Sequence, residues 1–194
     1  MSTSQTKVWT TTYLVSKTKL NSTRGMFLDW KKRFNIIEGV AQGLIYLHKY
    51  SRLRVIHRDL KASNVLLDEN MNPKISDFGM TKIFTHNEME ANNSRIGIFS
   101  LKTDVYSFGV LLLEIISGRK SNSFYNDDHV LNILGYAWRL WKVGTWIELM
   151  DPTLGDSCNR NQFLRCVHVG LLCVEENGED RPTLLARSDT HIDE

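Results

Sequence analysis

The chain has 194 residues, of which 42% are hydrophobic and 24% charged, so it can bury the core of one domain and is not disordered by composition. Its formal net charge of +2 argues against nucleic acid and anionic membranes as partners. The longest apolar run, residues 105–116, is shorter than the roughly 18 residues that a membrane span needs. With no signal-peptide pattern at residue 1, the sequence as written predicts a soluble cytosolic protein.

The first predicted element is a short strand over Val8 to Val15, which is rich in β-branched and aromatic residues but has no recognisable partner. A helix follows from Trp30 to about Lys49, with Asp29 as its N-cap. Apolar residues recur along it at helical spacing, so this helix is expected to be largely buried. The stripe consists of Phe34, Ile37, Ala41, Leu44 and His48, and Ile36, Val40 and Leu47 widen it.

Three short strands are predicted around two polar loops: Val55 to Ile56, Val65 to Leu67, and Lys74 to Ser76. The last of them follows a turn signal, Asn72-Pro73. Short strands that flank exposed polar loops form a rigid scaffold of the kind on which catalytic groups are usually carried.

The second half of the chain is predicted to be helical, which makes the fold class mainly α. Residues 104–117 form a helix that is apolar on every side and ends at Gly118, so it belongs at the centre of the domain. Further helices are predicted over residues 130–143, closed by Gly144, and over residues 161–176. A last helix is expected to start at Arg181, with proline at its next position.

The three cysteines are Cys158, Cys166 and Cys173, and no C-x-x-C pair occurs among them. Cys166 and Cys173 are seven residues apart and therefore share one helical face. Two small core-facing residues in a reducing cytosol explain this spacing better than a disulfide or a metal site does.

Two polar motifs carry the chemistry: residues 57–64 (HRDLKASN) and residues 77–79 (DFG). Together they place a proton acceptor, a phosphate-contacting cation and two oxygen ligands for a hard metal ion within one short span. Phosphoryl transfer needs this set, because its catalysis is mostly positioning plus charge stabilisation. The motifs therefore indicate phosphoryl-transfer chemistry.

The two motifs resemble the catalytic and metal-binding loops of protein kinases, in the order that is typical of that family. Four further stretches look like those of plant receptor-like kinases, and the subgroups with lectin-type or cysteine-rich ectodomains are the most similar. They are residues 28–33 (LDWKKR), 43–48 (GLIYLH), 104–110 (DVYSFGV) and 179–183 (EDRPT).

The resemblance implies a protein-kinase large lobe, in which a helical bundle surrounds a buried central helix and short strands flank the catalytic loop. It places a partial kinase domain over residues 22–187, between an atypical N-terminal segment (1–21) and a tail (188–194).

By this resemblance, Asp59 accepts the proton of a substrate hydroxyl or orients that hydroxyl, since a carboxylate only accepts hydrogen bonds. Lys61 neutralises charge on the transferred phosphoryl group, and a lysine at this place is typical of serine/threonine kinases. Asn64 and Asp77 hold Mg²⁺ beside ATP. Leu66 forms the floor of the adenine pocket.

Arg58 is expected from the same resemblance to pair with a phosphate on the activation segment, through charge-assisted bidentate hydrogen bonds. Thr81, Thr85 and Ser94 are candidate acceptors of that phosphate. Each of the three could equally be an ordinary loop residue, and for any single one of them that is the better explanation.

Asp104 is expected to accept backbone hydrogen bonds from the catalytic loop. A simpler explanation is a carboxylate at a helix N-terminus, which the macrodipole favours, and the two explanations are compatible. His57 is a packed structural histidine in the family, and Phe78 and Gly79 complete the second motif around Asp77.

Three stretches depart from the family pattern. The sequence contains no G-x-G-x-x-G and no strand lysine before residue 57, so the small lobe that covers the ATP phosphates is expected to be missing. About a dozen residues of the activation segment are absent after Ile96, including the glutamate that normally pairs with an arginine at the position of Arg181. Residues 184–194 do not resemble the final helix of the family.

Three readings of function follow. The chain is a serine/threonine protein kinase that transfers a phosphoryl group from ATP to protein substrates, a catalytically inactive lobe that binds related kinases or their substrates, or a non-functional truncated product. The missing phosphate cover argues against efficient turnover by these residues alone. The resemblance also implies a single-pass plasma-membrane parent whose kinase domain faces the cytosol.

Overall fold

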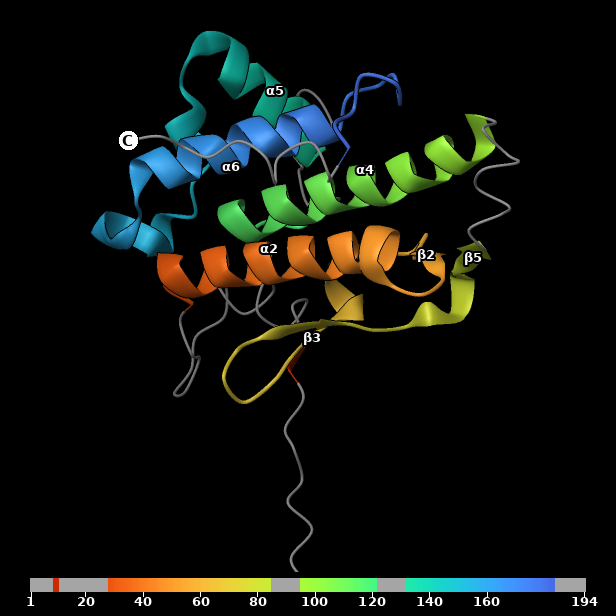
Figure 1. The fold of residues 1–194 in the computed structure, drawn as a ribbon. Coiled ribbons are helices and arrows are strands. Elements are labelled where there is room, and N and C mark those ends of the chain that lie inside the picture. The colour runs from red at the N-terminus through yellow and green to blue at the C-terminus, as the bar shows by residue number, and fades with distance from the viewer. Residues whose placement is uncertain (1–8, 11–27, 85–94, 122–131, 184–194) are drawn as a thin grey trace, which may run out of the picture.

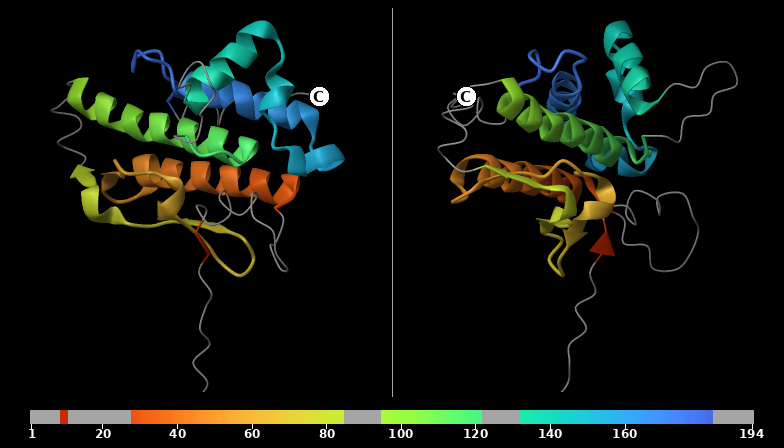
Figure 2. Two further views of the ribbon diagram at one scale, coloured as in Figure 1. Left: turned by 180° about the vertical axis from the view of Figure 1, so that it is seen from behind. Right: turned by 90° about the vertical axis from the view of Figure 1, so that its right-hand side faces the viewer.

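The computed structural model describes residues 9–10, 28–84, 95–121 and 132–183. Its long helices lie in layers. Helix α2 (Trp30–Ile45) is sandwiched between short strands on one side and α4 (Arg95–Ser117) on the other, and α6 (Arg160–Cys173) packs on the far face of α4 (Figure 1). Helix α5 (Ile133–Val143) lies on that same far side, away from the strands (Figure 2). The chain is helix-rich with few strands, as the sequence predicts.

Helix α2 begins at its predicted cap, because the Asp29 carboxylate accepts the backbone N–H of Lys32 at 2.9 Å. Its α-helical hydrogen bonding gives way at Tyr46 to one π-helical turn, η1 (Tyr46–Tyr50). The predicted end near Lys49 is therefore confirmed. The predicted stripe points inward, with Ile36, Ile37, Val40, Leu44 and His48 all buried.

The three predicted strands are confirmed to within one residue. β2 (Arg54–Ile56) pairs antiparallel with β5 (Lys82–Phe84), a strand that the sequence did not predict, and β3 (Val65–Leu67) forms a hairpin with β4 (Pro73–Ile75).

β1 (Trp9–Thr10) pairs antiparallel with β3, so the expectation that the first strand lacks a partner is wrong. The partner lies more than fifty residues away, beyond the reach of local sequence patterns. The rest of the predicted strand, residues 8 and 11–15, lies outside the described residues.

Helix α4 is the central element, in contact with α2, α5 and α6. It begins at Arg95, well before the predicted start at Asp104. The longer helix is possible since residues 95–103 contain no proline, which would break it. Asp104 therefore lies inside the helix, and the explanation by a helix N-terminus is wrong. The predicted end is confirmed by Gly118 at φ 65°. Buried apolar residues face every side: Val105, Phe108, Leu111, Leu112, Leu113, Ile115 and Ile116.

Two glycines set the close contact between α4 and α6. A Cβ on Gly109 would lie 2.6 Å from the Cβ of Cys173 and 2.9 Å from the carbonyl oxygen of Gly170. A Cβ on Gly170 would lie 2.9 Å from Leu113. Because protein interiors have no spare volume at such contacts, a side chain at either position would push the two helices apart.

The remaining helices have side-chain caps. Asn132 caps α5 by accepting the N–H of Gly135 at 2.9 Å, and Gly144 ends it at φ 82°. Asn159 caps α6, which ends at Cys173 and not at the predicted Glu176, because Val174 leaves helical geometry.

Cys166 and Cys173 are buried, as predicted, and neither forms a disulfide among the described residues. Residues 181–183 are not helical, and the remainder of the helix predicted to begin there lies outside the described residues.

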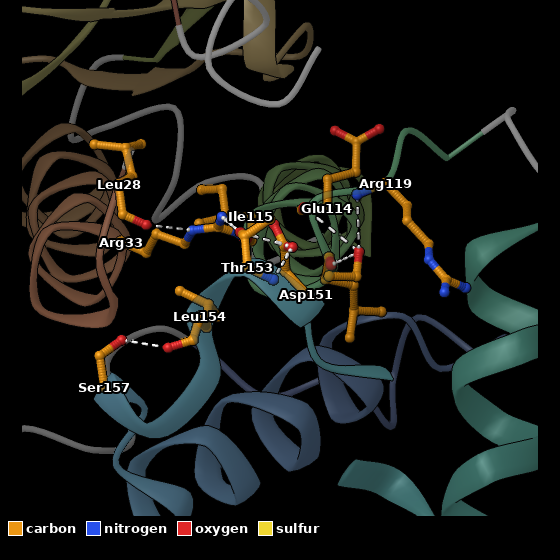
Figure 3. A network of polar contacts seen from close by, with 11 residues as sticks. Leu28, Arg33, Glu114, Ile115, Arg119, Asp151, Thr153, Leu154 and Ser157 are labelled. Atoms are coloured by element: carbon orange, nitrogen blue, oxygen red, sulfur yellow. Dashed lines mark hydrogen bonds and ion pairs between the residues drawn. The ribbon is translucent and has the colours of Figure 1, made fainter. Parts of the chain in front are cut away.

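A buried ion pair ties α2 to the segment before α6 (Figure 3). One guanidinium nitrogen of Arg33 donates to Asp151 Oδ2 at 2.6 Å, another donates to the carbonyl of Ile115 in α4, and Nε donates to the carbonyl of Leu28. Asp151 Oδ1 accepts from the N–H and the hydroxyl of Thr153. Every charge in this network therefore has hydrogen-bond partners, which is the condition under which buried charges are tolerated.

Candidate active site

The loop after β2 is fixed to the central helix by Asp104, whose side chain is fully buried. Asp104 Oδ2 accepts the backbone N–H of His57 at 2.8 Å, and Oδ1 accepts that of Arg58 at 2.7 Å. These are the hydrogen bonds that the resemblance implies. His48 of η1 adds a third contact, with Nε2 2.8 Å from Oδ2. The sequence placed His48 only in the apolar stripe, and its polar pairing could not be read from helical spacing.

Arg58 is held in a left-handed conformation, with φ at 69°. Such a conformation costs a non-glycine residue about 1–3 kcal/mol and persists where surrounding contacts over-determine it. Here the contacts are the two hydrogen bonds from consecutive N–H groups to one carboxylate. This left-handed conformation changes the direction of the backbone just before Asp59.

Asp59, Lys61 and Asn64 are joined by hydrogen bonds, with Lys61 exposed, Asp59 half-buried and Asn64 buried. Lys61 Nζ is 2.7 Å from Asp59 Oδ2, and Asn64 Nδ2 donates to the same oxygen at 3.1 Å and to the Asp59 carbonyl at 2.8 Å. The hydrogen bond from Lys61 is the main reason why the pKa of Asp59 lies below its usual value, and the Lys61 charge and Asn64 add to it. Asp59 is thus a carboxylate at neutral pH.

His57 joins the first motif to the second. Its ring is buried, its Nε2 lies 2.9 Å from the carbonyl oxygen of Ser76, and it meets Phe78 edge-on with ring centroids 5.2 Å apart. Ser76 in turn donates from its N–H and its hydroxyl to the carbonyl of Asn64, at 2.8 and 2.9 Å. Ser76 is a positioning residue that sequence reasoning missed.

The β3–β4 hairpin brings Asn64 and Asp77 to one end of the sheet. Val65 pairs with Ile75, so Asn64 lies next to Ser76 at this end of the hairpin, and Asp77 follows Ser76 directly. Asp77 adopts a left-handed conformation at φ 62°, and its carboxylate lies so near Gly79 that a Cβ there would be 3.3 Å from Oδ1. A glycine therefore suits the close approach of this carboxylate.

A family model described as "Protein tyrosine and serine/threonine kinase" matches residues 6–185. The chain belongs to the protein kinase family. It is 54% identical over 171 residues to G-type lectin S-receptor-like serine/threonine-protein kinase SD1-13 of Arabidopsis thaliana. The aligned region covers 81% of this chain and 21% of that relative. It is also 54% identical over 171 residues to cysteine-rich receptor-like protein kinase 10 of the same plant, with 81% and 26% covered.

These matches confirm both receptor-like subgroups that the sequence indicated. The kinase-family chain spans about a fifth to a quarter of the length of these relatives. Among the helices of the described residues, none is long and apolar enough to cross a membrane.

The donor set of this kinase chain fits a hard divalent cation. The Asn64 amide nitrogen donates to Asp59, and its Oδ1, which accepts only a long hydrogen bond from the Ser63 hydroxyl at 3.4 Å, can serve as an oxygen ligand. Asp77 adds an exposed carboxylate. Within the described residues no three His, Cys, Asp or Glu side chains gather in a metal-ligand cluster. Mg²⁺ tolerates such a sparse set because it is usually bound by one or two protein oxygens, substrate phosphates and water.

Arg181 makes no ion pair with a carboxylate of the described residues, but each of its three guanidinium nitrogens donates a hydrogen bond. The acceptors are the carbonyl oxygens of Glu175, Lys102 and Glu176, at 2.7, 3.4 and 3.2 Å, and the guanidinium lies 4.7 Å from the ring centre of Tyr106. Lys102 is buried beside it and donates to the Arg181 carbonyl. Burial, and then the Arg181 charge, lower the pKa of Lys102.

Of the other predicted site residues, three lie within the described part of the chain and two lie outside it. Leu66 is half-buried in β3, opposite Lys74, and Arg58 is exposed. The Thr81 hydroxyl donates to the carbonyl of Phe78 at 2.8 Å, so it has a local structural use. Thr85 and Ser94 lie outside the described residues.

Proposed function

We propose that this chain carries the phosphoryl-transfer loops of a receptor-like serine/threonine kinase, in the large lobe of a kinase domain over residues 22–187. The observation that carries the proposal is the cluster of Asp59, Lys61 and Asn64, joined through one Asp59 oxygen. The hairpin register places Asp77 at the same end of the sheet. The reaction is transfer of a phosphoryl group from ATP to a serine or threonine hydroxyl of a protein substrate.

Asp59 orients the acceptor hydroxyl in this proposal. Its lowered pKa makes it a weak base, so its main contribution is one of positioning. The hydroxyl oxygen forms the new bond to phosphorus as the bond to the ADP oxygen breaks, and the hydroxyl proton leaves toward Asp59. Lys61, now paired with Asp59, has the reach and charge to stabilise the transferred group.

Mg²⁺ would be held by the Asn64 amide oxygen and the Asp77 carboxylate, and when bound it would neutralise phosphate charge. Asp104 acts through the loop that it anchors. Because both oxygens of Asp104 are occupied, it is a positioning residue for Asp59 and contributes nothing to binding.

Residues 1–194 alone are expected to turn over ATP slowly or not at all, since they contain no glycine-rich loop to cover the nucleotide phosphates. A second candidate function is therefore an interaction module that binds related kinases or protein substrates. Exposed Tyr46, Tyr50 and Phe78 favour it, because large apolar side chains in water mark binding surfaces. For location, we propose the cytosolic side of the plasma membrane, as for the receptor-like parent.

A thermal melt of residues 1–194 with and without Mg·ATP tests the proposal. Ligand that binds only the folded state raises its stability by mass action, so the parent chain should melt higher with Mg·ATP. Asp77→Asn should melt at the same temperature as the parent without ligand and lose the increase. Asp156→Asn, an exposed aspartate before α6, is the matched control and should keep it.

A cooperative melt that Mg·ATP leaves unchanged would reject the nucleotide site and favour the interaction module. An increase that survives in Asp77→Asn would show that the metal-dependent site lies elsewhere. Absence of any cooperative transition would support a truncated product that does not fold by itself.

A further inference from the structure

We propose that the open edge of β5 binds an extended acidic segment of another protein as an added strand. The site consists of the β5 backbone (Lys82–Phe84) and a cationic surface formed by Lys49, Arg52, Arg54 and Arg58. It does not depend on phosphoryl transfer, and none of the groups assigned to catalysis or to the metal belongs to it.

Among the described residues, β5 pairs with another strand along one edge only. The sheet that contains it has two strands, in which Val55 of β2 pairs with Ile83 of β5. β2 is also covered by η1 and α4, whereas β5 packs mainly on β2. No strand of the described residues lies along the other edge of β5. An unpaired edge presents a row of backbone donors and acceptors, which is the template for strand addition.

Two apolar side chains at or next to β5 are exposed to solvent. Ile83 is 55% exposed and Met80, just before the strand, is 59% exposed. The Phe84 side chain is buried and anchors this end of the strand to the domain. The Lys82 ammonium lies over its ring, 4.6 Å from the ring centre. A buried anchor with exposed neighbours allows alternate side chains of an added strand to find apolar contacts.

The surrounding charge selects an acidic occupant. Residues 46–58 contain four Lys and Arg residues and no Asp or Glu, and residues 78–84 add Lys82 and again no acid. The strand register sets Arg54 opposite Phe84 and Ile56 opposite Lys82, so both stretches meet at one surface. The whole chain carries only +2, which makes this local excess distinctive.

A polypeptide explains these features better than a lipid surface does. Anionic headgroups would match the cations but not the row of backbone groups along β5. A segment in which acidic and apolar residues alternate matches the cations, the exposed Ile83 and the open edge together.

Fluorescence anisotropy with purified residues 1–194 tests this site. The probe is a labelled peptide in which glutamate alternates with valine and isoleucine, and vesicles of phosphatidylserine and phosphatidylcholine are the second ligand. We expect peptide binding that weakens as salt rises. It should weaken about tenfold or more in the double variant Lys82→Glu/Ile83→Glu, because like charges then face each other.

The chain offers a matched control. Lys142 and Val143 at the end of α5 form another exposed lysine–aliphatic pair, with Val143 71% exposed, and Lys142→Glu/Val143→Glu changes net charge equally. This control should bind the peptide like the parent chain. Equal losses in the two double variants would overturn the proposal, since they would indicate attraction to net charge alone.

A second peptide keeps the test independent of how the variants fold. Methylation of alternate backbone nitrogens removes the donors for strand pairing while it preserves charge and side chains, so the methylated peptide should bind much more weakly. Equal binding of both peptides would contradict strand addition. Binding of the vesicles but not of the peptide, lost in Lys82→Glu/Ile83→Glu, would replace the proposal with a membrane surface.

Discussion

Two pairs of aspartates divide the molecule into a structural and a chemical part. Asp104 and Asp151 are buried at 0% and 3% exposure, and each has hydrogen-bond donors on both carboxylate oxygens. Both oxygens of Asp104 accept from distant segments, whereas Asp151 accepts from distant Arg33 on Oδ2 and from neighbouring Thr153 on Oδ1. Asp59 lies partly exposed with its side-chain contacts gathered on Oδ2. Asp77 is exposed, and its side chain makes no hydrogen bond to the described residues.

The two pairs differ in the acceptor capacity that remains on their carboxylate oxygens. A buried carboxylate must be fully paired, because an unpaired charge in the interior is costly. A carboxylate that is to bind a metal or a hydroxyl must keep acceptor capacity for it. Occupied oxygens therefore mark Asp104 and Asp151 as anchors, and the oxygens available on Asp59 and Asp77 are what the roles proposed for these two residues require.

The largest effect should come from breaking the Asp151 anchor. Arg33→Ala leaves the Asp151 carboxylate buried without its partner, which typically costs about 3–5 kcal/mol. Urea unfolding followed by circular dichroism measures the free energy of unfolding. Lys31→Ala, an exposed cation on the same helix, should change it by less than about 0.5 kcal/mol. Similar small losses for both variants would show that Asp151 has no anchoring role.

Loss of the Asp104 carboxylate should cost somewhat less. Asp104→Asn replaces one accepting oxygen by an NH₂ group, which donates and cannot accept, so the N–H of either His57 or Arg58 loses its acceptor. Hydrogen bonds to a charged group contribute about 1.5–3 kcal/mol. We expect lower stability together with faster amide exchange at His57 and Arg58. Exchange that speeds up uniformly over the chain would argue against a specific tie to the loop.

Glu114 supplies a smaller and pH-dependent effect. Burial raises the pKa of this carboxyl above its unfolded value, although its Oε1 accepts the N–H of Ser121 at 2.7 Å. A raised pKa means that the fold favours the protonated form, so Glu114 lowers stability increasingly as pH rises through the unfolded value toward the folded one.

Glu114→Gln should therefore stabilise the chain at neutral pH and have no such effect at a pH below both values. Thermal melts of the two chains at both pH values measure this difference. A gain of the same size at both would mean that ionisation is not its cause.

The working aspartates should matter least for stability. Asp59→Asn removes an exposed ion pair with Lys61, and such pairs contribute about 0–1 kcal/mol. The pKa of Asp59 is lowered, so the small contribution is present at neutral pH and disappears as pH falls through the folded pKa. Urea titrations at neutral and acid pH measure it, and a loss as large as that of Arg33→Ala would erase the distinction between the two pairs.

Most predictions that rest on local signals agree with the structure, although the end of α6 and the helix start at Arg181 do not. Apart from the contact of Asp104 with the catalytic loop, which the family resemblance implied, contacts between distant residues were not predicted. The cap at Asp29, the end at Gly118 and the strands beside the two motifs depend on neighbouring residues, which a sequence displays directly. The backward extension of α4 was missed because Asp104 resembles an N-terminal carboxylate, while its real partners lie 46 to 56 residues away. The motif residues were predictable as a set, but their shared hydrogen bonds depend on side-chain directions that no spacing specifies.

The pair between Arg33 and Asp151 also has a kinetic consequence, since its two residues are separated by 118 positions along the chain. Closing so long a loop has an entropic cost that is repaid only when the segments between are already packed. The pair should form after the transition state for folding and act mainly as a brake on unfolding. Arg33→Ala would then shorten the lifetime of the native state while it leaves the folding rate almost unchanged.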